Sequence, residues 1–178
     1  MEALEVIAQP HFDKADLAWL TDIRSRRAGS RGAPHFTLVF PGADLAPKVF
    51  ADKVRANVEG MHAIRFRLRC ALVAPEPMVG RFHVFLVPDE GFAAILKLHD
   101  RLHVGPISAA LRKDRPYLPH ITVATTHDDA SARTLAASLN QGGIDIHGHI
   151  DALLAEHRTG EVIKTVATIP LSRAGLFG

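Results

Sequence analysis

The chain has 178 residues, 47% of them hydrophobic and 22% charged, with a formal net charge of +2. This length and composition are typical of one globular domain, exclude disorder throughout, and carry too little positive charge to indicate nucleic-acid binding by charge alone. There is no apolar run of about 18 residues and no secretory signal at residues 1–9, so we expect a cytoplasmic protein without a transmembrane helix.

Hydrophobic periodicity and turn residues divide the first half of the chain into alternating strands and helices. Asp13 is typical of a helix N-cap, and Pro47 suits a first helical turn. The expected elements are a strand at 1–8, a helix after Asp13 up to about 24, a strand at 35–40, a helix from 47 to about 58, and a hairpin of strands at 64–74 and 81–87. The second helix is expected to bury Val49 together with its other apolar residues.

The second half repeats this order. The expected elements are helices at 91–103 and near 107–111, a strand at 120–124, a helix capped by Asp128 up to about 139, and a final hairpin of strands at 144–155 and 161–169 around Thr159 and Gly160. The repeated order predicts one α+β domain spanning 1–178. We expect it to be bilobed, with duplicated antiparallel sheets and flanking helices around a central cleft, and with pseudo-repeats of about 11–87 and 88–170.

One short motif occurs in both halves. Residues 34–37 and 119–122 both read Pro-His-apolar-Thr, and the two histidines are 85 positions apart. Composition alone predicts roughly 0.03 occurrences of Pro-His-x-Thr in a chain of this length, so two copies favour a shared function.

The motif places an imidazole beside a hydroxyl. Residues two apart on a strand point to the same face, so His35 lies beside Thr37, and His120 beside Thr122. If a pseudo-twofold axis relates the halves, both faces meet across one cleft. One imidazole can then act as general base and the other as general acid, while the hydroxyls bind phosphate oxygens. Such chemistry suits a phosphodiester and needs neither a nucleophilic side chain nor a metal.

These motifs, with the segments at 82–86 and 116–118, resemble the 2H phosphoesterase superfamily, specifically its 2′-5′ RNA ligase and RNA 2′,3′-cyclic phosphodiesterase family. The resemblance covers essentially the whole chain. It implies a bilobed α+β fold and hydrolysis of a 2′,3′-cyclic phosphate on an RNA end or a nucleotide, without metal or cofactor. In some members it also implies reversible 2′-5′ RNA ligation. It further implies acid–base roles for His35 and His120 and phosphate binding by Thr37 and Thr122.

The chain departs from the family at one place. Many members of the ligase branch have an arginine shortly after the second motif, where this chain has Ala124, Thr125 and Thr126. A cation for the phosphate must come from elsewhere, and Arg31 and Arg115 are the nearest candidates in the sequence. Tyr117 is a candidate for stacking on a base.

Two alternatives to this function remain open. One is a nonenzymatic module that binds RNA ends in the same cleft. The other is a 2H hydrolase of a small nucleotide, such as an ADP-ribose cyclic phosphate. In each case we expect a monomer without membrane contact.

Other polar patterns have simpler interpretations. Arg65, Arg67 and Arg69 alternate on one strand face, which favours a solvated face over an RNA track. The spacings of 99 with 103 and of 147 with 149 permit metal binding. Asp100 is a possible further ligand for the first pair, but its helix lacks the glutamate of a metalloprotease motif, and no third ligand is evident for the second pair. We therefore interpret these histidines as surface residues. Cys70 alternates with apolar residues and is expected to lie in the core.

Overall fold

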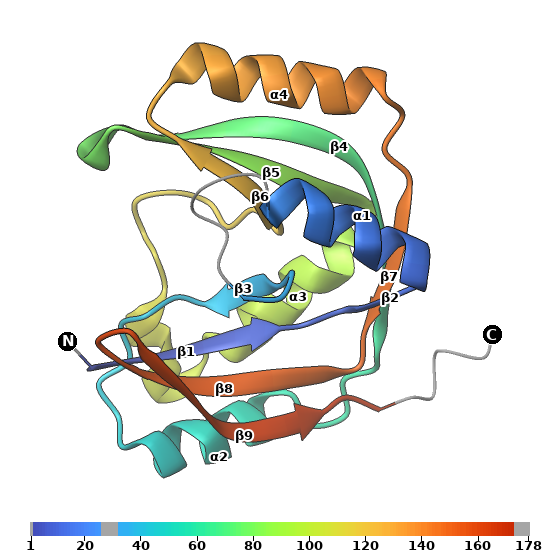
Figure 1. The fold of residues 1–178 in the computed structure, drawn as a ribbon. Coiled ribbons are helices and arrows are strands. Elements are labelled where there is room, and N and C mark those ends of the chain that lie inside the picture. The colour runs from blue at the N-terminus through green and yellow to red at the C-terminus, as the bar shows by residue number, and fades with distance from the viewer. Residues whose placement is uncertain (1, 26–31, 173–178) are drawn as a thin grey trace.

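Two antiparallel sheets with helices around them make up residues 2–25 and 32–172, the part of the chain that the computed structural model describes (Figure 1). The four-stranded sheet has the order β3-β1-β8-β9, with β1 (Glu2–Ala8), β3 (Phe36–Val39), β8 (Ala152–Thr159) and β9 (Val162–Pro170). The five-stranded sheet has the order β2-β7-β4-β5-β6, with β2 (His11–Phe12), β4 (Ile64–Glu76), β5 (Arg81–Glu90), β6 (Ile121–Thr126) and β7 (Ile146–Ile150). This architecture confirms the α+β class with two antiparallel sheets.

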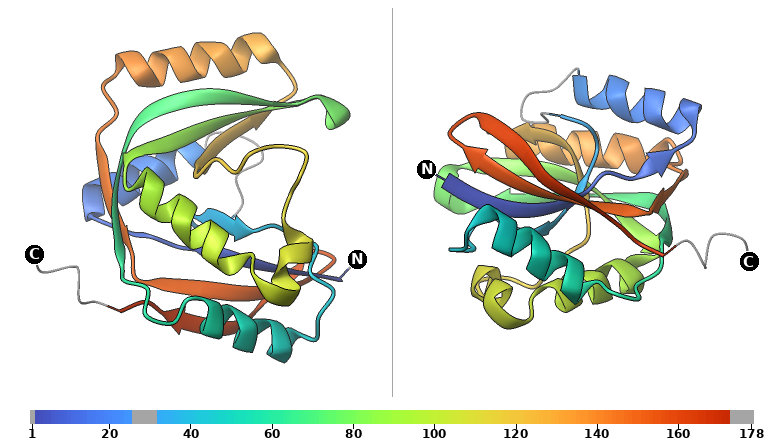
Figure 2. Two further views of the ribbon diagram at one scale, coloured as in Figure 1. Left: turned by 180° about the vertical axis from the view of Figure 1, so that it is seen from behind. Right: turned by 90° about the horizontal axis from the view of Figure 1, so that it is seen from below.

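Helices cover both sheets. They are α1 (Lys14–Ser25), α2 (Pro47–Asn57), α3 (Phe92–Leu102) and α4 (Asp129–Gln141), with short 3₁₀ helices η1 (Pro77–Val79) and η2 (Gly105–Ala110). Helix α4 packs on the five-stranded sheet, α2 packs on β8 and β9, and α3 contacts strands of both sheets (Figure 2). Within the described ranges, no helix has both the length and the apolar character needed to cross a bilayer.

The expected helix starts are confirmed by their capping contacts. Asp13 accepts a hydrogen bond from the backbone N–H of Asp16 at 2.8 Å, and Asp128 accepts one from the N–H of Ser131 at 2.9 Å. Pro47 is the first residue of α2. These contacts satisfy N–H groups that a helix start leaves without an intrahelical partner.

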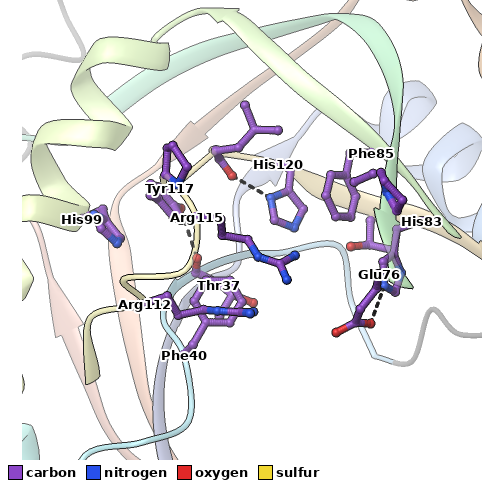
Figure 3. Close-up of a pocket in the computed structure, with 15 residues that line it drawn as sticks. Thr37, Phe40, Glu76, His83, Phe85, His99, Arg112, Arg115, Tyr117 and His120 are labelled. Atoms are coloured by element: carbon purple, nitrogen blue, oxygen red, sulfur yellow. Dashed lines mark hydrogen bonds and ion pairs between the residues drawn. The ribbon is translucent and has the colours of Figure 1, made fainter. Parts of the chain in front are cut away.

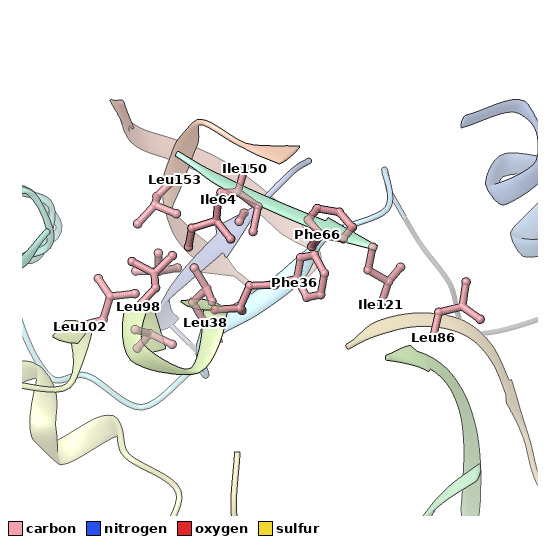
Figure 4. Packing of buried hydrophobic residues seen from close by; sticks show 14 of the residues in the cluster. Phe36, Leu38, Ile64, Phe66, Leu86, Leu98, Leu102, Ile121, Ile150 and Leu153 are labelled. Carbon is pink, nitrogen blue, oxygen red and sulfur yellow. The ribbon is translucent and has the colours of Figure 1, made fainter. Parts of the chain in front are cut away.

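Alternation along β3 and β6 separates a core face from a polar face. Phe36, Leu38, Ile121 and Val123 are all fully buried, and the Phe36 ring meets Phe66 edge-on at 5.1 Å (Figure 4). The core therefore holds the alternate residues of both motif strands, and the histidine and threonine positions lie on the opposite face.

The two sheets are interleaved along the sequence. β3 lies in one sheet with the β8–β9 hairpin, whereas β6 lies in the other with the β4–β5 hairpin. Each sheet thus combines the motif strand of one half of the chain with the hairpin of the other half. Neither sheet can form from one half alone, which ties the positions of the two motifs to one another.

The final hairpin was predicted only in part. Residues 144–155 do not form one strand, because β7 pairs with β4 whereas β8 pairs with β1 and β9. The chain passes from the five-stranded to the four-stranded sheet at Asp151, between these strands. Apolar alternation does not reveal a change of pairing partner, so the sequence predicted the β8–β9 turn and missed this crossover.

Three smaller expectations need correction. Cys70 is exposed, because a β-bulge between Leu68 and Cys70 shifts the β4–β5 register and turns Ala71 inward instead. Val49 is 45% exposed, so it lies outside the buried face of α2. The expected helix near 107–111 is the 3₁₀ helix η2, which begins at Gly105.

Candidate active site

A cavity of about 360 Å³ is lined by residues of both sheets and of the segment before β6 (Figure 3). Three of the four predicted motif side chains line it, namely Thr37, His120 and Thr122. Its other walls come from β4, β5, α3 and residues 112–118. The long segment between η2 and β6 therefore closes the space between the two motif strands.

Both motif histidines make the same hydrogen bond. Nδ1 of His35 lies 2.9 Å from the carbonyl oxygen of Ala33, and Nδ1 of His120 lies 2.6 Å from that of Leu118. A carbonyl oxygen only accepts, so each Nδ1 carries the proton and donates it. Each neutral ring therefore presents Nε2 as a lone-pair nitrogen, the state required of a general base.

Proline helps to hold this geometry. Pro34 and Pro119 stand between each histidine and the carbonyl that it contacts, and both prolines are buried. A proline restricts its own φ and disfavours the helical conformation of the residue before it. The carbonyls of Ala33 and Leu118 are thereby held in extended segments, within reach of the ring two residues later.

His35 is placed differently from His120. It is partly exposed and is not among the residues that line the cavity, although its neighbour Thr37 is. The charge of His35 nevertheless acts on the pKa of His120. The structure therefore gathers Thr37, His120 and Thr122 around one space and sets His35 beside it.

Burial lowers the pKa of both imidazoles. The pKa of His120 falls from 6.5 to about 4, chiefly because burial disfavours the imidazolium, with smaller contributions from the charges of His83 and His35. Burial also lowers the pKa of His35, an effect that Arg24 and Arg158 reinforce and Glu5 opposes. Both rings are consequently neutral near pH 7.

An aromatic stack fixes the His120 ring. Phe85 lies on it with 3.7 Å between ring centroids, and His83 follows on the far side of Phe85 at 5.7 Å. His83 is in turn held by Thr125 through Nδ1 at 2.9 Å and by Glu76 through Nε2 at 3.0 Å. This stack, from β5, both orients and desolvates His120.

The sequence did not assign roles to these residues of β5. His83 and Phe85 lie in a segment that carried the family resemblance, and they are two apart, so alternation does place them on one face. Choosing the face that meets His120 requires the β5–β6 register, in which Phe85 pairs with Thr122 and a bulge follows Val84. That register is a long-range property.

Two arginines stand at the rim of the cavity. Arg112 and Arg115 both contact the carboxylate of Asp114, which lowers the pKa of Asp114 to about 2. The Arg112 guanidinium also lies 5.6 Å above the Phe40 ring. Arg115, one of the predicted phosphate cations, extends into the cavity opening (Figure 3). The other candidate, Arg31, lies outside the described residues.

Tyr117 lines the cavity but has structural contacts of its own. Its hydroxyl donates to the backbone carbonyl of Thr37 at 3.0 Å, and its ring stacks on His99 at 3.8 Å. Burial raises the pKa of the Tyr117 hydroxyl, which therefore remains a donor. Tyr117 thus fastens the segment before β6 to β3, and His99 covers one face of its ring.

The expectation that His99 and His103 are surface residues is wrong. They are 4% and 9% exposed, because α3 turns them toward Tyr117 and the interior. Nδ1 of His103 donates to the carbonyl of His99.

The face of β4 that was predicted to be solvated carries ion pairs, since Arg67 contacts Asp145 and Glu90. This pairing with acids does not favour an RNA track.

The fold and the repeated Pro-His-x-Thr motif define a 2H phosphoesterase. The family model of the 2′-5′ RNA ligase superfamily matches residues 12–160, and the chain belongs to that family. The search of curated protein sequences gave no match.

Solved structures of Usb1 share the fold. Usb1 of Kluyveromyces marxianus is 10% identical, with 95% of this chain and 98% of the Usb1 chain covered and a TM-score of 0.56. Usb1 of the same organism with uridine monophosphate is also 10% identical, with 96% and 98% covered and a TM-score of 0.52. At this identity the likeness shows the fold alone.

Removing the stacked ring of Phe85 should raise the pKa of His120. In Phe85→Ala the imidazole is better hydrated, so we expect its pKa to move from about 4 toward 6.5, by about one unit or more. An NMR pH titration of the His120 ring measures this. The matched control is Phe82→Ala, since Phe82 is on the same strand but is not among the cavity residues. An unchanged His120 pKa in Phe85→Ala would show that the stack does not control its desolvation.

Proposed function

We propose that this protein hydrolyses a 2′,3′-cyclic phosphate, on an RNA end or on a nucleotide, by acid–base catalysis between His120 and His35. The observation that carries the proposal is the shared hydrogen bond from Nδ1 to the carbonyl two residues earlier, which leaves Nε2 of both rings for proton transfer. Family membership and the grouping of Thr37, His120 and Thr122 around one cavity support it.

The environments of the two histidines favour different roles. His120 has the more strongly lowered pKa, so it remains neutral and suits the general base. The charge of Glu5 favours the imidazolium of His35, and a bound phosphate would favour it further. His35 therefore suits the general acid.

The reaction follows from these roles. His120 Nε2 takes a proton from water while the water oxygen bonds to phosphorus. The bond from phosphorus to one ribose oxygen breaks, and His35 Nε2 gives that oxygen its proton. By analogy with the family, the departing group is the 3′ oxygen and the product retains a 2′-phosphate. The hydroxyls of Thr37 and Thr122 donate to the nonbridging oxygens. The residues that we assign to this chemistry require no metal.

The cavity sets a limit on what is bound. A volume of about 360 Å³ is at the small end for ligand sites and suits one nucleotide unit. Among the described residues that line the cavity, Arg115 and Arg112 at its rim provide positive charge for the phosphate or for a following nucleotide. A terminal nucleotide of RNA and a free cyclic nucleotide both meet this limit. In 2′-5′ ligation a 5′ hydroxyl takes the place of water: His120 accepts its proton as its oxygen bonds to phosphorus, and His35 protonates the departing 3′ oxygen. Cleavage of the 2′-5′ linkage reverses both transfers.

Substitution of either motif histidine should abolish most of the activity. For His35→Ala and His120→Ala we expect kcat/KM for a 2′,3′-cyclic nucleotide to fall about 10²–10⁴-fold, because each removes one proton-transfer group. His147→Ala, at an exposed position of β7, is the control and should keep full activity. Excess chelator should leave the wild-type rate unchanged. Wild-type rates in both variants would refute the mechanism, and binding without any turnover would favour the RNA-end-binding module.

The pH profile provides an independent test. Catalysis needs His120 neutral and His35 protonated, so kcat/KM should fall on the acid side near pH 4 and on the alkaline side below pH 6.5. The optimum of kcat/KM should thus lie below pH 6.5. In Glu5→Gln the alkaline side should move to lower pH, because Glu5 raises the pKa of His35. A wild-type optimum above pH 7 for kcat/KM would contradict this assignment.

A further inference from the structure

Three potential metal ligands meet at the edge of the five-stranded sheet that is opposite to β6. His11, His149 and Asp151 each offer one ligand atom, and these atoms lie within 4.8 Å of one another. His11 and His149 are direct partners in the β2–β7 pairing. Asp151 follows His149 by two residues, which puts its side chain on the same side of the chain.

The side chains already contact one another. His11 Nε2 lies 2.9 Å from Asp151 Oδ1, and the rings of His11 and His149 are stacked with 5.0 Å between centroids. The Asp151 side chain is 12% exposed, whereas that of His11 is 60% exposed. The group therefore combines a half-enclosed carboxylate with an imidazole that solvent reaches.

We propose that His11, His149 and Asp151 bind a divalent transition-metal ion of the Zn²⁺ type. Two imidazole nitrogens and one carboxylate oxygen are ligands that Zn²⁺ accepts. Bonds of about 2.0–2.1 Å in a tetrahedron require donor atoms roughly 3.3 Å apart, so the present spacing needs only small side-chain rotations. Water completes the fourth position.

The surrounding charges permit a cation. Arg65 is the cross-strand partner of His149 and opposes a metal ion at this place. Asp13 lines the same surface depression as Arg65 and offsets its charge, whereas the Glu90 carboxylate in that depression is already paired with Arg67 and Arg69. Asp151 adds a second negative charge as a ligand.

The position of the site indicates what the ion does. His11 lies where the chain passes from β1 of one sheet to β2 of the other, and Asp151 lies where it returns from β7 to β8. An ion held by both joins two crossovers between the sheets. On β4, His149 pairs with Arg65 near the start of the strand, whereas β4 lines the cavity at residues 74–76 near its end. The site is thus structural and separate from the catalytic cavity.

Zinc titration of the chelator-treated protein tests the proposal. Calorimetry with ZnCl₂ at pH 7.5 should show one tight equivalent, and the melting temperature should rise by roughly 5 °C or more at 100-fold excess over the dissociation constant. His11→Ala, His149→Ala and Asp151→Asn should each weaken binding at least about 10-fold.

His147→Ala is the matched control. His147 is exposed, lies on β7 two residues from His149, and contacts Asp145 instead of the proposed ligands. It should bind zinc as the wild type does. Asp151→Asn keeps the size of the side chain, so it remains informative if a histidine variant fails to fold. The proposal would be overturned if no zinc binds below 100-fold molar excess, or if the three ligand variants bind zinc as tightly as the wild type. The group would then be a His11–Asp151 ion pair.

Discussion

A hydrogen bond from imidazole Nδ1 to the carbonyl oxygen two residues earlier is the contact on which the candidate site depends. It occurs in both Pro-His-x-Thr motifs, at His35 and at His120. Because the acceptor is a carbonyl, the bond fixes which ring nitrogen carries the proton. A rigid proline in each motif and the strand that follows set the direction of Nε2. Without this bond, the rings would be two polar side chains at the starts of strands in different sheets, with no defined function.

The fold brings this local feature to one place. Burial of Phe36 and Ile121 in the common core forces their neighbours to the opposite face, and the exchange of hairpins between the halves fixes β3 relative to β6. The same burial removes water from His120 and lowers its pKa. Packing that stabilises the sheets therefore also sets the protonation state of the site.

Local patterns in the sequence predicted much of this arrangement, and long-range pairing explains what they missed. Asp13 and Asp128 cap helices as expected, and the motif strands bury the residues that alternation assigned to the core. The split at Asp151, the exposed Cys70 and the stack of Phe85 on His120 each depend on which strand pairs with which, and in what register. The His11–His149–Asp151 group was missed for the same reason, since its members are neighbours only after β2 pairs with β7.

The protonation state of the two rings in solution tests the central claim most directly. A long-range ¹⁵N–¹H correlation spectrum at pH 7.5 distinguishes the Nδ1–H from the Nε2–H form of each neutral histidine. The account predicts the Nδ1–H form for both His35 and His120, with both Nε2 resonances shifting together when one equivalent of a nucleoside 2′-monophosphate binds. An Nε2–H form at either ring, or a response at only one of them, would contradict it.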